Sequence, residues 1–313
     1  MGRYVGKRIL LMVPVLMGVT LLIFLLLHFT PGDPARMQLG TLATEEEILA
    51  QREKMGLNDP LVVQFGRYLK NLVTDLDLGV SYTSGRPVTT EIFSRYPTTI
   101  LLAVLSVCVT LIIGIPTGIL SAVKQYSWVD NISMTVGLVG ISVPNFWLGL
   151  MLSLLFALKL RWLPASGFYG PKYWILPALS IGLSSAATIM RMTRSAMLEV
   201  IRQDYIRTAR AKGQTERMVI IHHALKNALI PIITVVGIQF GVLLGGAMVT
   251  EQIFSVPGLG SYLVTAIGQR DYPVIQGGVL VMAFTSGLVN LAIDIIYSFV
   301  DPRIKSQYQK KKR

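Results

Sequence analysis

Charge is scarce in this 313-residue sequence. Asp, Glu, Lys and Arg make up 15% of it, whereas hydrophobic residues make up 52%. A soluble globular domain carries about 25% charged residues. The mean hydropathy of +0.56 agrees with this deficit. The composition therefore indicates that lipid is the main solvent of the chain.

Cysteine and the motifs of common enzymes are also scarce or absent. The one cysteine, Cys108, lies in an apolar run and excludes an intrachain disulfide. The sequence contains no P-loop, no H-E-x-x-H and no G-x-S-x-G, and its three histidines form no metal-binding pattern. We therefore expect this chain to hold no catalytic residue, no metal and no cofactor of its own, and not to be an enzyme.

Long apolar segments are what the sequence has in abundance. A membrane-crossing helix needs about 20 mostly apolar residues. Arg191 and Arg194 weaken the fourth such segment, and we expect their side chains to snorkel to the interface. Pro144 predicts a break in the third segment, and the glycines around Pro116 predict a kink in the second. The sequence predicts an all-α membrane protein with six transmembrane helices, at residues 9–29, 98–123, 132–158, 175–197, 229–250 and 277–300.

The distribution of basic residues predicts the orientation. The segments 1–8, 124–131, 191–228 and 301–313 together hold 18 Lys and Arg against five acids, whereas the segments on the other side hold 11 of each. Because Lys and Arg are enriched in cytoplasmic loops, both termini are expected in the cytoplasm. The net charge of +12 is then a consequence of topology, and nucleic acid is not an expected partner.

Residues 30–97 are too long for a simple connection and carry signals for external helices. Thr44 and Glu47 form a capping box that opens one helix. Asp59-Pro60 opens a second helix, with Asp59 as its N-cap. We expect a small external helical subdomain that is either a structural cap or a docking surface for an external partner. The second helix is expected to pack through Val62, Phe65, Leu69 and Leu72.

A polar stretch separates the fourth and fifth segments. It reads DYIRTARAKGQTERMVIIHHALKN from residue 204, and Gly213 divides it into two short helices. Thr215 is a plausible N-cap of the second helix, with Glu216 in its first turn. An apolar face of that helix is expected to rest on the bundle. Small residues beside Gly213 favour a knob for a partner's groove over a helix lying on lipid. The expected apolar face consists of Met218, Ile221, Leu225 and Ala228.

This stretch resembles the EAA loop of bacterial ABC importer permeases, whose general form is E-A-A-x-x-x-G. Ala209 and Gly213 match that form, whereas Arg207 and Thr208 replace the Glu and the first Ala. Other motifs occur in the order found in the first permease subunit of dipeptide, oligopeptide and nickel importers. They are TPGDP from residue 30, DLGVS from 77, RPV from 86, RYPTT from 95, EQIFSVPGLGSYL from 251 and RDYPVIQG from 270.

The resemblance implies a permease of the bacterial inner or plasma membrane that imports short peptides. Its partners would be a second homologous permease, two ATP-binding cassette ATPases that bind ATP and Mg, and an external solute-binding protein. Nickel or an oligosaccharide as cargo stays open, and so does a passive channel or membrane scaffold, which would have no use for the EAA-like loop. The residues implied to couple to the ATPases are Arg207, Thr208, Ala209, Arg210, Ala211, Lys212, Gly213, Thr215 and Glu216.

The apolar spans and the resemblance together divide the chain into four parts, while spacing and polarity single out residues within the membrane. The expected parts are the tail and first helix (1–29), the external subdomain (30–97), the transmembrane domain (98–303, with the coupling loop at 198–228) and a basic cytoplasmic tail (304–313). Glycines four residues apart let helices approach closely, within the chain or at the second permease; here they are Gly237, Gly241 and Gly245. Polar residues at depth mark a translocation path; here they are Asn145, Gln239 and Asn290.

Overall fold

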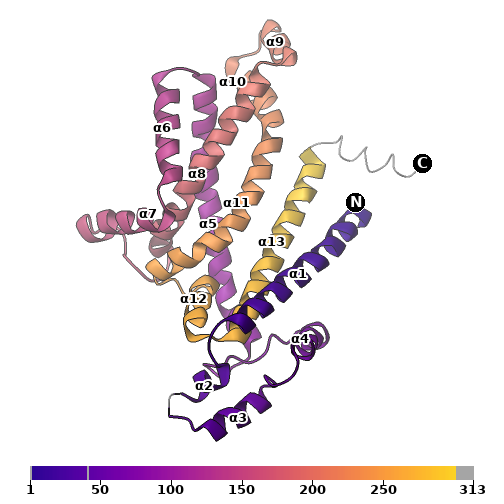
Figure 1. Cartoon of the computed structure of the whole chain (residues 1–313). Helices are drawn as coiled ribbons and strands as arrows, with labels where there is room; N and C mark the ends of the chain where they lie inside the picture. The colour runs from indigo at the N-terminus through magenta and orange to yellow at the C-terminus, as the bar shows by residue number, and fades with distance from the viewer. Residues whose placement is uncertain (1, 41, 301–313) are drawn as a thin grey trace. The chain divides into compact units, whose positions relative to one another are not determined.

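The structure is a computed structural model that describes residues 2–40 and 42–300. Every regular element in these ranges is a helix, and one isolated antiparallel bridge joins Val80 to Pro87 (Figure 1). The chain forms two compact units. The first unit comprises Met1–Thr99 and Pro257–Gly287, and the second comprises Ile100–Val256 and Leu288–Arg313. The expected tail at 304–313 lies outside the described residues.

Five helices are long and apolar enough to cross a membrane, which confirms five of the expected segments. Each contains a run of mostly apolar residues longer than the roughly 20 that a bilayer requires. They are α1 (Gly2–Phe29), α5 (Val88–Val123), α8 (Pro171–Ile201), α11 (Leu225–Ile253) and α13 (Tyr272–Val300).

The third expected segment, 132–158, is not one straight helix. It consists of α6 (Trp128–Ser142), α7 (Asn145–Leu152) and the π-helix η1 (Ser153–Lys159), with a bend of 104° between the two arms. Proline removes a backbone donor and forces the preceding residue out of the helical region. Val143 is accordingly extended, with ψ of 124°. The predicted break at Pro144 is confirmed, and the arms form a broken span or a re-entrant loop.

Three short helices follow α1 in the first unit: α2 (Pro34–Leu39), α3 (Glu45–Lys54) and α4 (Leu61–Asp75). The capping box of α3 is confirmed, since the Thr44 N–H donates to Glu47 Oε2 at 2.8 Å and the Glu47 N–H donates to Thr44 Oγ1 at 3.4 Å. Asp59 does not cap α4. Its carboxylate pairs with Arg67, and Pro60 takes the N-cap position.

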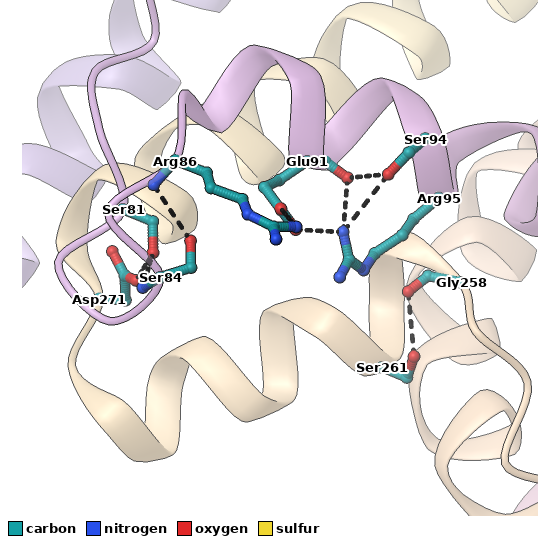
Figure 2. Close-up of polar contacts among 9 residues, drawn as sticks. All are labelled: Ser81, Ser84, Arg86, Glu91, Ser94, Arg95, Gly258, Ser261 and Asp271. Atoms are coloured by element: carbon teal, nitrogen blue, oxygen red, sulfur yellow. Dashed lines mark hydrogen bonds and ion pairs between the residues drawn. The ribbon is translucent and has the colours of Figure 1, made fainter.

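A buried carboxylate ties the loop after α4 to the segment between α12 (Leu259–Gln269) and α13 (Figure 2). Asp271 accepts a hydrogen bond from the Ser81 hydroxyl, and it accepts backbone N–H groups of Tyr82 at 3.0 Å and Thr83 at 3.2 Å. These donors replace the water that the carboxylate loses on burial. Burial, helped by the charge of Asp271, raises the pKa of Tyr82 to about 12.

A second buried carboxylate lies in the first turn of α5, also in the first unit. Glu91 pairs with Arg95 one turn later and more loosely with Arg86, at 3.5 Å (Figure 2). The Arg95 guanidinium also stacks 4.2 Å from the ring centre of Tyr262. Arg95 thereby links α5 to α12 through both an ion pair and a cation–π contact.

Glycines bring α5 and α8 into close contact in the second unit. A Cβ atom at Gly118 would lie 2.6 Å from the backbone oxygen of Met190, and one at Gly114 would lie 2.9 Å from that of Ala186. Gly182 has the matching role on α8, where a Cβ would lie 2.9 Å from the Ser106 oxygen. These glycines have a packing role within a helix that is continuous through Pro116. The kink expected around Pro116 stays a prediction.

A buried ion pair joins α6 to α8. Asp130 is 2% exposed, and its two oxygens each receive an Arg194 nitrogen at 2.7 Å. The Ser121 hydroxyl and the Tyr126 N–H complete the hydrogen bonds of the carboxylate. The prediction that Arg194 snorkels to the interface is therefore wrong, because a buried carboxylate within reach requires its charge.

Candidate coupling site

The polar stretch forms two short helices at the end of α8, as expected. They are α9 (Asp204–Ala211) and α10 (Glu216–Met218), and the latter continues as the π-helix η2 (Val219–Ala224) into α11. Buried side chains of both helices join a core cluster with residues of α8 and α11. The members from the stretch are Ile206, Ala209, Val219, Ile220 and Ala224.

Half of the predicted apolar face of the second helix is confirmed. Ala228 is buried in the core cluster and Leu225 packs against it, whereas Met218 is 48% exposed and Ile221 is 50% exposed. Val219, Ile220 and Ala224 are buried in place of those two residues. The expectation assumed α-helical periodicity. A π-helix pairs residue i with i+5, so it adds a residue to the turn and rotates the following side chains. The sequence carries no pattern from which we could have identified this π-turn.

Gly213 makes the turn between the two helices. Its φ of +77° lies in the left-handed region that favours glycine, and its N–H bonds the carbonyl of Arg210 at 2.9 Å. No atom lies within 4 Å of the position that a Cβ would take. The absence of a side chain therefore serves the backbone conformation and leaves open space beside the turn.

An ion pair closes the turn from the outside. Arg210 Nε lies 2.7 Å from one oxygen of Glu216, and Arg210 Nη2 lies 3.3 Å from the other. This hydrogen-bonded partner raises the pKa of Arg210. Thr215 caps α10, as expected, by accepting the Met218 N–H at 3.4 Å. Because the pair is exposed, we assign it to the shape of the turn and only weakly to stability.

Side-chain hydrogen bonds outside the predicted set also connect the two helices. His223 Nε2 lies 2.6 Å from Gln214 Oε1, and Asn227 donates to the Tyr205 hydroxyl at 2.7 Å. These contacts hold the turn against the start of α11. The sequence did not predict them, because it gives no signal for which side chains meet across the turn.

The residues implied to couple to an ATPase divide into two groups. Ala209 is only 8% exposed and belongs to the core cluster. The rest are exposed, and together with the turn they form one polar surface that carries several bases, which we call the coupling surface. It consists of Arg207, Thr208, Arg210, Ala211, Lys212, Gly213, Thr215 and Glu216.

The glycines of α11 have unlike surroundings. A Cβ at Gly237 would lie 2.0 Å from Ile293 Cδ1 of α13, so this glycine serves contact within the chain. Gly241 is half-buried. Gly245 is exposed, and nothing lies within 4 Å of its Cβ position. One end of the row therefore packs inside the chain and the other end remains open.

The polar residues at depth lie on three different elements. Asn145 begins α7 at the 104° bend and is half-buried, Gln239 is half-buried in α11, and Asn290 is exposed on α13. No hydrogen bond joins these three side chains to one another in the part of the chain that the structure describes. That part also contains no group of His, Cys, Asp or Glu able to hold a metal ion.

Comparison with known proteins agrees with this architecture. Residues 114–306 match the family described as "Binding-protein-dependent transport system inner membrane component", and residues 1–103 match its N-terminal counterpart. The dipeptide transport system permease protein DppB of Alkalihalophilus pseudofirmus is 47% identical over 97% of this chain and 100% of its own length. The glutathione transport system permease protein GsiC of Escherichia coli K12 is 43% identical over 97% of this chain and 99% of its own length.

Solved structures show the same fold at low sequence identity. An inward-facing MetNI methionine ABC transporter chain aligns with a TM-score of 0.57 and 20% identity, over 67% of this chain and 95% of its own length. Because the family matches cover most of the sequence, the chain belongs to the binding-protein-dependent transport system inner membrane components and is a multi-pass permease of the inner membrane.

Proposed function

We propose that this permease is the membrane-spanning subunit of an ATP-driven importer of short peptides. The names of two relatives support peptide cargo. Relatives that match nearly the whole chain are named for dipeptide and for glutathione, which is itself a small peptide. The sequence holds no P-loop, so ATP and Mg are assigned to partner ATPases.

The coupling surface carries this proposal. Its residues are exposed, while the opposite side of the same two helices is buried against α8 and α11. Because a close-packed core resists compression, a force applied to the coupling surface would be transmitted through the core cluster to α8 and α11. An ATPase groove that holds the turn at Gly213 would thus move α8 and α11 together.

The other subunits of the importer are assigned to further surfaces of this chain. A second homologous permease would contact the open end of the α11 glycine row at Gly245, two ATPases would lie at the coupling surface, and a solute-binding protein would deliver cargo to the external helices. The charge distribution places both termini in the cytoplasm. We assign the path lining to Asn145, Gln239 and Asn290.

The test is uptake by the reconstituted transporter carrying Ala211→Glu. Ala211 is exposed at the end of α9, so the substitution adds bulk and charge to the coupling surface without disturbing the core. We expect dipeptide uptake to be lost while the chain still inserts. Lys226→Glu, at an exposed position of the same stretch outside the coupling surface, is the matched control and should transport normally.

Two outcomes would contradict the proposal. Full uptake by Ala211→Glu would remove the coupling role. Uptake that proceeds without ATP would favour the passive channel. If uptake requires ATP but nickel or an oligosaccharide, and not a dipeptide, is accumulated, the importer stands and its cargo is reassigned.

A further inference from the structure

Helix α4 carries a wider apolar face than the chain covers. At 100° per residue, Leu61, Phe65 and Leu72 occupy one half of that face. Phe65 packs there on Phe24 of α1, with ring centres 5.2 Å apart. The expectation that α4 packs through Phe65 therefore holds for this half of the face.

The other half of the face is uncovered. Val62 was expected to pack inward, but it is 84% exposed, and Val73 and Leu76 are 76% and 74% exposed. Together with exposed Gly66 and half-buried Leu69 these residues form a row at intervals of three and four along one side of the helix and its C-cap, Leu76. We call this row the α4 apolar row. An apolar row on an external helix requires an apolar neighbour.

The contact between α4 and α1 gives the depth of this helix. Phe24 lies five residues before the end of α1, which is about 7.5 Å along its axis. The 25-residue span of α1 includes Lys7 and Arg8, and its uncharged part, residues 9–29, is about 31 Å long. This length matches a hydrocarbon core of about 30 Å, so the core ends near Phe29. The Phe65 contact thus lies roughly 7 Å inside that end of the hydrocarbon core, beside α1.

The polar residues of α4 are arranged as a bilayer surface requires. Lys70 is exposed at the margin of the α4 apolar row, where its chain can reach a phosphate while its stem covers apolar surface. The acidic Asp75 lies on the far side of the helix. On that far side, Gln64, Arg67, Tyr68 and Asn71 line a cavity of about 340 Å³, whose wall on α1 includes Phe24 and Leu27. The polar side chains of α4 and the α4 apolar row thus lie on opposite sides of the helix.

We propose that α4 lies in the outer interface of the bilayer, with the α4 apolar row among the acyl chains. An interfacial helix buries its apolar face about 5–10 Å into the boundary between headgroups and acyl chains, which agrees with the depth of the Phe24 contact. The external subdomain is then anchored to lipid next to α1, in addition to its covalent connection.

A fluorescent probe on the two sides of α4 tests this proposal. In a Cys108→Ser background, Val73→Cys and the matched control Asp75→Cys are labelled with an environment-sensitive dye. The assembled transporter is reconstituted in vesicles of phosphatidylethanolamine and phosphatidylglycerol, with and without brominated acyl chains. We expect brominated lipid to quench the probe at residue 73 strongly and the probe at residue 75 weakly. Both positions are exposed, so the labels should leave folding intact.

Two results would overturn the proposal. Equal emission of the residue 73 probe in brominated and ordinary lipid would exclude contact with acyl chains. If that probe instead responds only when the solute-binding protein is added, the α4 apolar row is a protein-docking surface. Neither result depends on the cargo or on the coupling surface.

Discussion

Two rows of glycines with the same four-residue spacing have different neighbours. On α5, Gly114 and Gly118 lie against backbone atoms of α8, and no side chain could be added without a shift of the helix. On α11, Gly237 lies against the Ile293 side chain, and no atom of the described residues lies within 4 Å of the Cβ position of Gly245. The same spacing thus occurs at a helix contact that is complete within this chain, at Gly114 and Gly118, and in a row whose end at Gly245 is open.

A contrast between a buried and an exposed member of a pair also occurs at other residues of the same type. Ala209 is buried and Ala211 is exposed, although both belong to the EAA-like loop. The Arg194 ion pair is buried, whereas the Arg210 ion pair is exposed. Inward residues should act on folding and outward residues on assembly or transport, and substitutions at these pairs separate the two effects.

The largest loss of stability is expected from Arg194→Ala. Removal of one partner of a buried ion pair leaves Asp130 uncompensated and typically costs 3–5 kcal/mol. Thermal unfolding in detergent, followed by tryptophan fluorescence, would measure the change. Because the double variant Asp130→Asn with Arg194→Gln removes both charges, it should recover part of the loss. A single variant that unfolds like the original protein would show that the pair is dispensable.

The next effect is expected from Gly118→Leu. Overpacking of a tight core typically costs about 1–3 kcal/mol, and here the obstacle is the Met190 backbone, which cannot turn aside. The yield of protein extracted in folded form should fall. Gly245→Leu is the matched control for stability, since its surroundings are open. Equal losses in both variants would erase the distinction between the two glycine rows.

Gly245→Leu should instead weaken assembly. Glycines at helix interfaces in membranes allow close backbone approach, which a leucine prevents. We expect less of the second permease to co-purify with a tagged chain, while the chain itself unfolds normally. Gly241→Leu should act in the same direction. Co-purification in equal amount with both variants would assign this surface of α11 to lipid.

Ala209→Asp and Ala211→Asp should fail in different ways. The first places a carboxyl group in the core cluster without a partner, so we expect loss of folded protein. The second changes only the coupling surface, so a stable transporter without uptake is expected. Quantifying the folded chain and dipeptide uptake in the same preparation makes the comparison. If the Ala209→Asp chain folds stably, Ala209 would be reassigned from the core cluster to the coupling surface.

The smallest effect on stability is expected from Glu216→Gln. The pair with Arg210 is exposed, and exposed ion pairs contribute about 0.2–1 kcal/mol. Because the pair shapes the turn at Gly213, dipeptide uptake should fall clearly while the unfolding temperature changes little. Asp204→Asn, which lies outside the coupling surface and removes a longer exposed pair of 3.7 Å with Arg207, is the control for the loss of one negative charge.

Much of the architecture could be predicted because the length of apolar segments is a direct consequence of the bilayer thickness. The capping box at Thr44 was equally predictable, since it depends on two residues three positions apart, Thr44 and Glu47. The π-turn at Val219, the partner of Arg194 and the inward glycines of α5 could not be predicted. Each depends on contact with α8, and a single sequence shows which residues can pack but not what they meet.

The hydrogen bonds of Asp271 impose an order on biosynthesis. The carboxylate holds Ser81, which lies 190 residues earlier in the chain. At a synthesis rate of about 5–20 residues per second, that separation corresponds to a delay of about 10–40 s. Helices α2, α3 and α4 must therefore remain without this connection while four more apolar segments are synthesised. Their docking would be a late step, at which a chain translated past Asp271 gains protection of the Ser81 loop from proteases.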